Sequence, residues 1–385
     1  HHHLKFLWHQ DRVDTFLRGR PYDIKPITVE FVPSLDCNFG CGHCTYDQWK
    51  NRTIDKIGHR KMLKENMQFL LDKLAYSGVK SMIITGGGEP FTNPHTIEGI
   101  EYAKSLGFDL GVFTNGSLLN PEKIDKISSH ANFVRISLDA VTEDVYLAFH
   151  GINNPRIFET VKANIKYFAS ISQRKSKTAS FGLGAIVKEL NVDDMTNVAV
   201  FARDVVNETG GGIKAINYRP VINYREREKQ ISPVVLEKAK RHEEKIRRVL
   251  EDTHITPFFA FDYFADAVAG QERKKEYQKC LANPWAASVA YDGNLYLCSE
   301  NDGNQKFALG NLLNQSLDEI WESSRRKEII GCIGDCEAPT CKLHRLNKSL
   351  NRIGEVSLTE EEIVKVNEFC DILKNAGNPG GPNFL

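Results

Sequence analysis

Three cysteines lie close together near the start of the chain. Cys37, Cys41 and Cys44 fall within eight residues, and the next cysteine is Cys280. Iron–sulfur clusters are held by cysteine thiolates, so three thiols in one loop can bind three irons of a cubane [4Fe–4S] cluster. The fourth iron would then have no protein ligand, which would let it bind a small molecule directly.

Two other uses of these cysteines stay open. A structural zinc site needs four ligands, and His43 is the candidate for the fourth, although a ligand inside so tight a loop would strain the geometry. A disulfide framework fits poorly with the reducing compartment that we infer from the rest of the chain.

The composition is that of an ordinary globular protein. The chain has 385 residues, which is enough for two domains or for one large α/β domain with an appendage. Of these residues, 41% are hydrophobic and 26% are charged. The formal net charge is zero, which argues against an extended nucleic-acid surface. We find no signal peptide and no apolar run long enough for a membrane span, so we predict a cytoplasmic protein without a membrane partner. His1 to His3 are interpreted as a tag remnant.

Strand and helix patterns alternate from residue 27 to about residue 218. Apolar residues recur at helical spacing in 60–78 and 154–171. Asn120-Pro121 and Ser232-Pro233 are typical helix starts. The predicted strands are the short β-rich runs 27–33, 80–86, 109–114, 133–138, 181–187 and 213–218.

Six strand–helix units in series predict a parallel sheet with helices on its outside. A closed TIM barrel needs eight units, so we predict an α/β fold with an open, partial (β/α)6 TIM barrel. The chemistry of such sheets lies at the carboxyl ends of the strands. The cysteine loop follows the first predicted strand and is therefore expected at that edge.

The sequence changes character after about residue 230. Residues 232–252 carry interleaved charges of both signs, which indicates a solvated helix. Residues 286–298 predict a β-hairpin that turns at Asp292-Gly293, and helices are predicted at 316–331 and 358–374. The predicted division is 1–26 tag remnant and lead-in, 27–230 barrel, 231–279 helical connector, 280–350 small cysteine-rich α+β domain, and 351–385 final helix and tail.

A second group of cysteines lies in the last quarter of the chain. Their spacing suits an iron–sulfur cluster, and zinc is the alternative. Cys370 shares one helix face with Ile363 and Val366 and is interpreted as a core residue. The group consists of Cys280, Cys298, Cys332, Cys336 and Cys341.

The spacing of the first three cysteines resembles the CxxxCxxC signature of radical SAM enzymes. The resemblance continues through later strand ends, with TGGGEP at 85–90, FTNG at 113–116, SLDA at 137–140 and GLGAIV at 182–187. Each motif alone is weak, because glycine turns and SLD caps are common. Their order after a three-cysteine loop is specific. His43 is a departure, since the family usually has an aromatic residue before the third cysteine.

The resemblance implies a binding site for S-adenosylmethionine (SAM) at the strand ends. The GGE motif would bind the amino group, with the carboxylate of Glu89 as its anion. The later motifs would contact the methionyl carboxylate, the ribose and the adenine, and His43 would lie near the adenine. The implied SAM-binding residues are His43, Gly87, Gly88, Glu89, Asn115, Ser137 and Asp139.

The resemblance also implies a reaction. SAM would chelate the open iron, and an electron from the cluster would split SAM to give a 5′-deoxyadenosyl radical that takes a hydrogen atom from the substrate. In such chemistry the protein supplies position and exclusion of side reactions. The electron would come from an external one-electron reductant such as flavodoxin or ferredoxin.

The hairpin and the later cysteines resemble the SPASM/Twitch extension of radical SAM enzymes, which holds auxiliary [4Fe–4S] clusters. The full SPASM pattern has a further cysteine where this chain has Arg345. Five thiols cannot complete two cubanes, so we favour one auxiliary cluster, held by Cys280, Cys298 and two of the other three. A second cluster, completed by Cys370 or by a ligand other than cysteine, remains open.

Two substrate classes follow from the resemblance. The first is a small polar molecule, such as a sugar, aminocyclitol or nucleoside in natural-product biosynthesis, which would be oxidised or epimerised. Tyr218 and Arg219, at the end of the last predicted barrel strand, are the candidate substrate residues.

The second class is a precursor peptide, modified by a thioether or C–C cross-link, epimerisation or side-chain oxidation. Many peptide-modifying relatives carry a leader-binding module before the barrel, and the fewer than thirty residues there leave no room for one, so we favour the small molecule. A non-catalytic iron–sulfur or zinc scaffold is the remaining alternative.

Overall fold

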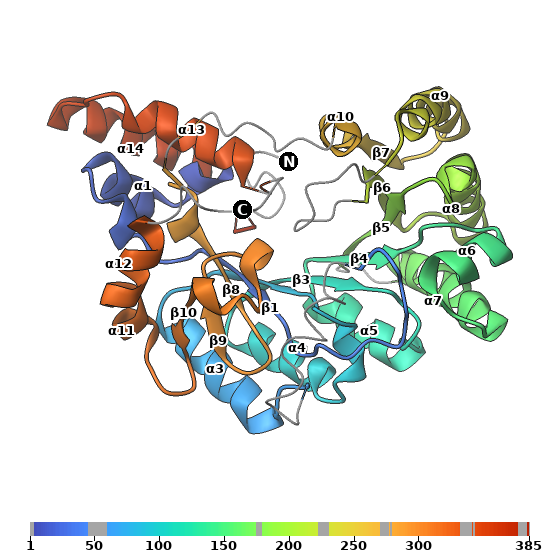
Figure 1. The fold of residues 1–385 in the computed structure, drawn as a ribbon, viewed down its shortest axis with the longest axis horizontal. Coiled ribbons are helices and arrows are strands. Elements are labelled where there is room, and N and C mark those ends of the chain that lie inside the picture. The colour runs from blue at the N-terminus through green and yellow to red at the C-terminus, as the bar shows by residue number, and fades with distance from the viewer. Residues whose placement is uncertain are drawn as a thin grey trace.

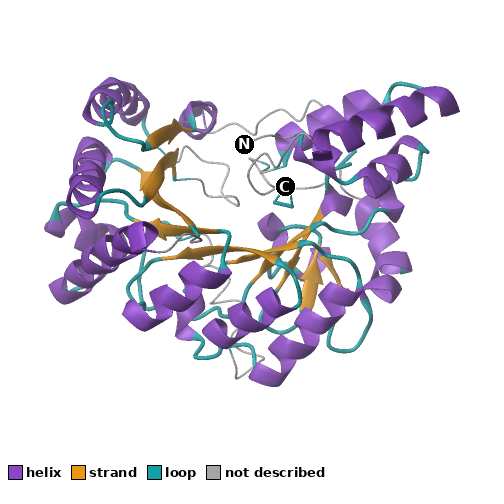
Figure 2. Cartoon of the chain, turned by 180° about the vertical axis from the view of Figure 1, so that it is seen from behind, coloured by secondary structure: helices purple, strands orange, loops and turns teal. Residues whose placement is uncertain are grey.

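The computed structural model describes residues 4–44, 60–174, 179–221, 231–269, 277, 279–331, 341, 343–375 and 383–384. Within them the strands form one sheet in the order β10-β9-β8-β1-β2-β3-β4-β5-β6-β7. The sheet is curved, and helices cover its convex side (Figures 1 and 2). The strands are β1 Thr28–Phe31, β2 Ser81–Ile84, β3 Asp109–Thr114, β4 Phe133–Ser137, β5 Ser180–Val187, β6 Ile213–Pro220, β7 Thr256–Phe259, β8 Ala286–Val289, β9 Asn294–Tyr296 and β10 Ala308–Asn311.

The predicted open barrel is confirmed. All six predicted barrel strands are present, and β1 to β6 pair in parallel in chain order. The α-helices are α1 Gln10–Leu17, α3 Lys64–Tyr76, α4 Thr96–Ser105, α5 Pro121–His130, α6 Glu143–His150, α7 Pro155–Arg174, α8 Met195–Thr209, α9 Pro233–Val249, α10 Phe261–Ala269, α11 Leu317–Glu322, α12 Ser324–Gly331, α13 His344–Gly354 and α14 Glu360–Asn375.

Local sequence explains where the helices begin. Asn120 caps α5, because its side chain accepts a hydrogen bond from Lys123 N at 2.9 Å, and Pro121 occupies the first turn. Ser316 and Glu319 form a capping box at α11. The single helix predicted at 316–331 is two helices, since α11 ends at Glu322 and α12 begins at Ser324.

Two more parallel strands extend the barrel sheet beyond the predicted six. β7 pairs with β6, and β8 pairs with β1 at the opposite side. The short TPFF segment of β7 contains a proline, which is tolerated because the strand lies at the sheet edge. The predicted hairpin is present as β8 and β9, with Gly293 at φ 82° in its turn, and β10 adds a third strand.

Alternate residues of each barrel strand face opposite sides of the sheet. In β5, Phe181, Leu183 and Ala185 are buried against the helices, whereas Gly182 and Gly184 are less buried and face the concave side. This concave side and the carboxyl ends of the strands define the interior in which a site can form.

A second core joins the two ends of the chain. Phe6 and Phe16 pack on Trp285 with ring centroids 5.4 and 6.4 Å apart, and Cys370 of α14 belongs to the same apolar cluster. The interpretation of Cys370 as a core residue is confirmed, since it is 1% exposed. The core therefore ties α1 and α14 to the start of β8.

The last described residues lie at the amino-terminal ends of the barrel strands. The Asn383 carbonyl accepts hydrogen bonds from Thr28 and Ser81, and its side chain donates to Asp109 at 2.7 Å. Phe384 packs edge-on against Phe133, at 4.8 Å between ring centroids. These contacts place residues 383–384 at the end of the barrel opposite to the cysteine loop.

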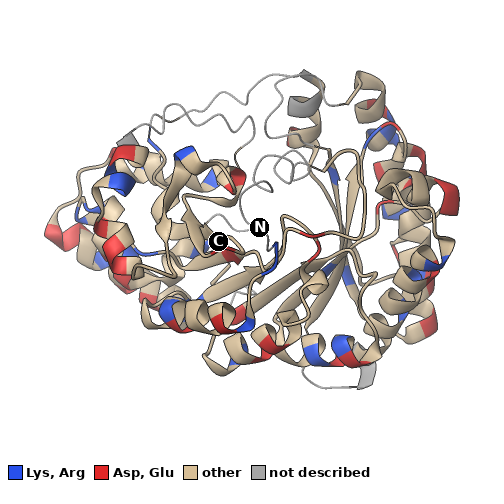
Figure 3. Cartoon of the chain, turned by 60° about the horizontal axis from the view of Figure 1, so that its bottom comes forward, with Lys and Arg blue, Asp and Glu red and all other residues tan. Residues whose placement is uncertain are grey.

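Charges lie mostly on the outer helices, with both signs interspersed (Figure 3). Among the helices of the described ranges, none combines the length and the apolar character that a membrane crossing requires.

Candidate SAM and iron–sulfur site

The loop after β1 carries the three cysteines, as expected. All three are partly buried, and Cys41 lies close enough to Cys37 and Cys44 for both thiols to affect its pKa. Burial is the main reason that this pKa is raised. Cys37 Sγ accepts a hydrogen bond from Phe39 N at 3.4 Å. The loop therefore already arranges its thiols close together.

The end of α6 packs against this loop. Gly40 N donates to His150 O at 2.9 Å, and Cys41 Sγ lies 3.3 Å from His150 Nδ1. Gly151 has φ +59°, and a Cβ atom there would lie 2.4 Å from Gly40 O. Two glycines thus allow the two backbones to approach closely.

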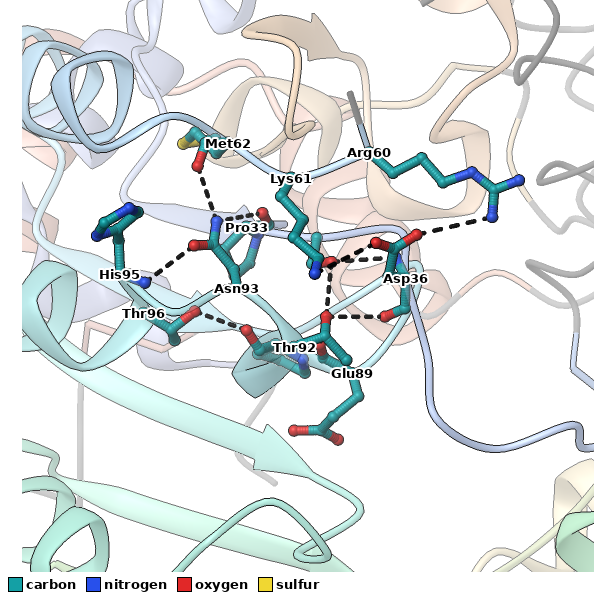
Figure 4. Close-up of polar contacts among 12 residues, drawn as sticks. Pro33, Asp36, Arg60, Lys61, Met62, Glu89, Thr92, Asn93, His95 and Thr96 are labelled. Carbon is teal, nitrogen blue, oxygen red and sulfur yellow. Dashed lines mark hydrogen bonds and ion pairs between the residues drawn. The ribbon is translucent and has the colours of Figure 1, made fainter. Parts of the chain in front are cut away.

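The glycine-rich loop after β2 approaches the cysteine loop in the same way. A Cβ atom on Gly88 would lie 2.0 Å from Asp36 O, and Glu89 N donates to that oxygen at 2.8 Å. Thr92 Oγ1 adds a bond to Asp36 O at 3.1 Å, and the Asp36 carboxylate lies 3.6 Å from Arg60 (Figure 4). The residues immediately before Cys37 are thereby fixed to the β2 loop.

The carboxylate of Glu89 points away from Asp36 (Figure 4) and is buried. It accepts hydrogen bonds from Thr114 Oγ1 and Asn115 N, both at 2.7 Å, and from Phe91 N at 3.2 Å. Burial raises the pKa of Glu89 to about 7 despite these donors. Glu89 therefore orders the end of β3, and its contact with the SAM ammonium remains a prediction.

Asn115 links the end of β3 to the cysteine loop. Its Nδ2 donates to Asn38 Oδ1 at 3.0 Å, and Asn38 Nδ2 donates to Ser117 Oγ at 2.8 Å. Asn38 lies beside Cys37 in sequence, so the SAM-site candidate Asn115 and the cysteine loop are brought together. The role of Asn38 has no sequence signal, because one asparagine in a loop is unremarkable.

Asp139 is 3% exposed at the end of β4. Its Oδ1 accepts from Ile186 N at 2.5 Å, and Oδ2 lies 3.3 Å from His150 Nε2. Burial raises the pKa of Asp139 to about 7, partly opposed by Ile186 N–H, Arg219, Arg135 and Lys188. Asp139 therefore joins β5 and α6 to the site, and its predicted contact with the ribose remains a prediction.

His43 packs against Phe149 of α6, with ring centroids 4.4 Å apart. Its Nδ1 atom is buried and has no hydrogen-bond partner among the described residues, and burial lowers the pKa of His43 to about 4. A neutral ring with an unsatisfied buried nitrogen fits a place beside a bound ligand.

The concave face carries polar and cationic side chains near these loops. On β4, Arg135 and Ser137 face inward, and the Arg135 guanidinium lies 3.6 Å from the centroid of the Phe113 ring. On β6, Asn217 and Arg219 face the same side. Arg135 and Arg219 both act on the pKa of Asp139, so both lie close to it.

The prediction that Tyr218 points toward the cavity mouth is wrong. Tyr218 is 0% exposed, donates to Met195 O at 3.0 Å and stacks on Phe259 at 5.2 Å. Adjacent strand residues point to opposite faces, so Tyr218 and Arg219 cannot share the cavity. The structure leaves Arg219 as the inward-facing residue of the two.

Three of the five later cysteines lie in the described chain. Asn301 Nδ2 donates to Cys298 Sγ at 3.2 Å, and Asn347 Nδ2 donates to Cys280 Sγ at 3.4 Å. The Tyr277 hydroxyl lies near Cys280 and Cys341, which help burial to raise the pKa of Tyr277. Cys332 and Cys336 lie outside the described residues. The auxiliary ligand set therefore remains a prediction.

Within the described ranges, no three His, Cys, Asp or Glu side chains converge on one metal position. The polar donors to Cys37, Cys280 and Cys298 are those expected around cluster sulfurs.

Comparison with known families agrees with this geometry. The model of the radical SAM superfamily matches residues 31–201, and the model of the SPASM iron–sulfur cluster-binding domain matches residues 280–346. The chain belongs to the radical SAM superfamily and carries a C-terminal SPASM domain. The two domains imply a SAM-binding [4Fe–4S] cluster, SAM and auxiliary iron–sulfur clusters as cofactors. Radical SAM enzymes also need an external reductant.

Individual relatives differ in their functions. The AdoMet-dependent heme synthase of Methanosarcina barkeri is 23% identical over 81% of this chain and 88% of its own length. A S-adenosylmethionine-dependent nucleotide dehydratase of Pseudoalteromonas ulvae is 33% identical, but over only 30% of this chain and 41% of its own length. The structure of Streptococcus suis SuiB bound to precursor peptide SuiA matches with a TM-score of 0.57 and 14% identity, over 84% of this chain and 73% of SuiB.

Proposed function

We propose that this protein cleaves SAM reductively and abstracts a hydrogen atom from a small polar substrate, leading to oxidation or epimerisation. Together, the cluster and SAM supply a 5′-deoxyadenosyl radical when both are bound. The observation that supports this function best is the meeting of the cysteine loop with the ends of β2, β3 and β4. Glu89 and Asn115 contact the cysteine loop directly, and Asp139 is linked to it through His150, which contacts Cys41.

The chain's own residues have separable roles in this proposal. Cys37, Cys41 and Cys44 hold the SAM-binding cluster. Gly88 lets the β2 loop approach Asp36 of the cysteine loop, and Glu89 keeps the neighbouring strand end in place. Gly87 stays a predicted contact with SAM. His43, Ser137 and Asp139 lie at the carboxyl ends of the strands, where they border the nucleoside.

The inner cations support a polar substrate that carries a carboxylate or other acceptor groups. Arg135 and Arg219 extend from β4 and β6, and between them β5 presents Gly182 and Gly184, which have no side chains to fill the space. A Cβ atom on Gly184 would lie 3.2 Å from Arg135 Cδ, so glycine leaves the arginine side chain its room. Guanidinium groups bind carboxylates through paired hydrogen bonds.

A precursor peptide is the second candidate substrate. It is favoured by the match to SuiB, whose structure holds a precursor peptide, although this likeness at 14% identity concerns the fold. A peptide carboxylate or backbone could occupy the same cationic interior.

Anaerobic reconstitution tests the proposal. The protein, loaded with iron and sulfide, is mixed with SAM and either dithionite or reduced flavodoxin or ferredoxin. We expect 5′-deoxyadenosine to form, and replacement of Cys37, Cys41 and Cys44 by alanine to abolish it. An intact cluster that yields no 5′-deoxyadenosine would favour a non-catalytic scaffold.

The substrate class is tested separately. Candidate sugars, aminocyclitols, nucleosides and precursor peptides from neighbouring genes are added, and the rate of 5′-deoxyadenosine formation and the substrate mass are followed. Arg219→Gln should raise KM for an anionic substrate at least about tenfold, since it removes a charged hydrogen bond. Acceleration by a peptide alone would contradict the small-molecule proposal.

A further inference from the structure

His150 lies outside the sequence motifs and contacts a cysteine of the loop after β1. Cys41 Sγ lies 3.3 Å from His150 Nδ1, and the other ring nitrogen, Nε2, lies 3.3 Å from Asp139 Oδ2. His150 and Asp139 are each 3% exposed. The three residues come from the cysteine loop, the end of α6 and the end of β4, and they form a buried thiol–imidazole–carboxylate row.

The surroundings fix the ring in this place. The His150 carbonyl accepts from Gly40 N at 2.9 Å, which ties its backbone to the cysteine loop. Its ring packs on Tyr146 and Phe39, with centroids 4.3 and 4.9 Å away. The imidazole therefore has little freedom to turn away from the sulfur.

We propose that His150 is a positioning residue for the SAM-binding cluster, and that its neutral imidazole carries its one hydrogen on Nδ1, which donates a hydrogen bond to Cys41 Sγ. Nε2 then has no hydrogen, so any hydrogen between it and Asp139 Oδ2 belongs to the carboxyl group. This inference rests on the proposed function, because Cys41 must be an iron ligand. A ligating thiolate carries no hydrogen, so the hydrogen in this 3.3 Å contact must come from the imidazole.

Such a bond has an electrochemical consequence. Hydrogen bonds to cluster sulfurs set the reduction potential, because they stabilise the more negative, reduced cluster. Cys37 receives its bond from the backbone of Phe39, which a substitution does not remove. The donor to Cys41 is a side chain, so its contribution can be measured.

The test compares His150→Leu with His150→Asn. The two new side chains have nearly the same branched shape, but only asparagine can place an N–H group near the position of Nδ1. Iron and sulfide content is measured first, and then the midpoint potential by EPR-monitored redox titration. The SAM-binding cluster is identified as the signal that changes when SAM is added.

We expect His150→Leu to lower the potential, so that the ratio of reduced to oxidised cluster at the wild-type midpoint falls about tenfold. His150→Asn should recover most of this ratio. If His150→Leu loses the SAM-binding cluster and His150→Asn keeps it, that result supports the hydrogen bond to Cys41.

Three results would overturn the inference. One is an unchanged potential in His150→Leu with full iron content. Another is a matching shift or loss in both variants, which would assign His150 to packing alone. The third is a wild-type protein without a SAM-responsive cluster, which would overturn the proposed function as well. If the wild type cleaves SAM but His150→Leu keeps the wild-type midpoint potential, this inference is wrong and the proposed function stands.

Discussion

A single methyl group at position 88 has no room in this fold. The ideal Cβ atom would lie 2.0 Å from the carbonyl oxygen of Asp36, which directly precedes Cys37. The glycine therefore matters because of what lies opposite it, and the cysteine loop must shift if any side chain is added.

We expect Gly88→Ala to reduce SAM cleavage about hundredfold, because small misplacements of a reacting group carry costs of this size. Iron content and 5′-deoxyadenosine formation are the measurements. Gly354→Ala is the control, since its Cβ atom would meet only ordinary contacts at 3.7 Å. Equal losses in both variants would contradict this explanation.

Glu89 should make the cofactor-free protein sensitive to pH. Its pKa is raised from 4.5 to about 7 by burial, so the folded state binds the proton more tightly than the unfolded state. Its contribution to stability is fully present below pH 4.5 and is lost as the pH rises through 7. The change is at most about 3 kcal/mol.

Urea unfolding of wild type and Glu89→Gln between pH 4.5 and 8 measures this contribution. The variant has no ionisable group at position 89. As the pH rises, the free energy of unfolding of the wild type should therefore fall by about 3 kcal/mol relative to that of the variant. A constant difference over this range would show that Glu89 does not titrate as described.

At the scale of elements, the connection between β4 and α6 contains Asp139 and positions the helix that ends at His150. Buried Asp194, before α8, holds this connection. Its carboxylate accepts from Val141 N at 2.6 Å, Thr142 N at 2.9 Å and Thr142 Oγ1 at 2.8 Å. One side chain from a later element thereby positions the start of α6.

Asp194→Ala should lower the free energy of unfolding by about 3 kcal/mol, because it leaves two backbone N–H groups without their partner. Chemical denaturation measures the change. The neighbouring Asp193→Ala is the control, as Asp193 is 70% exposed and pairs with Lys238 at the surface, and it should change stability by less than about 1 kcal/mol. Similar losses of stability in Asp194→Ala and Asp193→Ala would contradict the role that we give to Asp194.

At the scale of the whole molecule, the chain end contributes to the barrel. Asn383 and Phe384 contact the amino-terminal ends of β1 to β4, far in sequence from each of them. We therefore expect this tail to stabilise the barrel without taking part in chemistry at the opposite strand ends.

Phe384→Ala should lower stability by about 1–2 kcal/mol, since it removes a partly buried ring and its edge-on contact with Phe133. The thermal midpoint should fall, while SAM cleavage at 25 °C stays near the wild-type rate. Ile372→Ala, at a position 63% exposed on α14, should leave the midpoint unchanged. An unchanged midpoint for Phe384→Ala would mean that the tail contacts carry no stability.

The sequence by itself determined the class of the protein and most of its elements. Hydrophobic periodicity and caps placed all six predicted barrel strands and the hairpin, because these signals are local. The cysteine spacing and the ordered strand-end motifs identified the radical SAM and SPASM domains, because that chemistry constrains residue type and order within short segments.

Only the tertiary structure decided which side chains meet. Residues of β6 alternate between its two faces, but only packing decided that Tyr218 lies on the helix side. Packing also brought Glu89 to its hydrogen-bond donors at the end of β3. The contact between Cys41 and His150 joins residues 109 positions apart. The pairing of β8 with β1 likewise depends on packing across the chain, which no local pattern encodes.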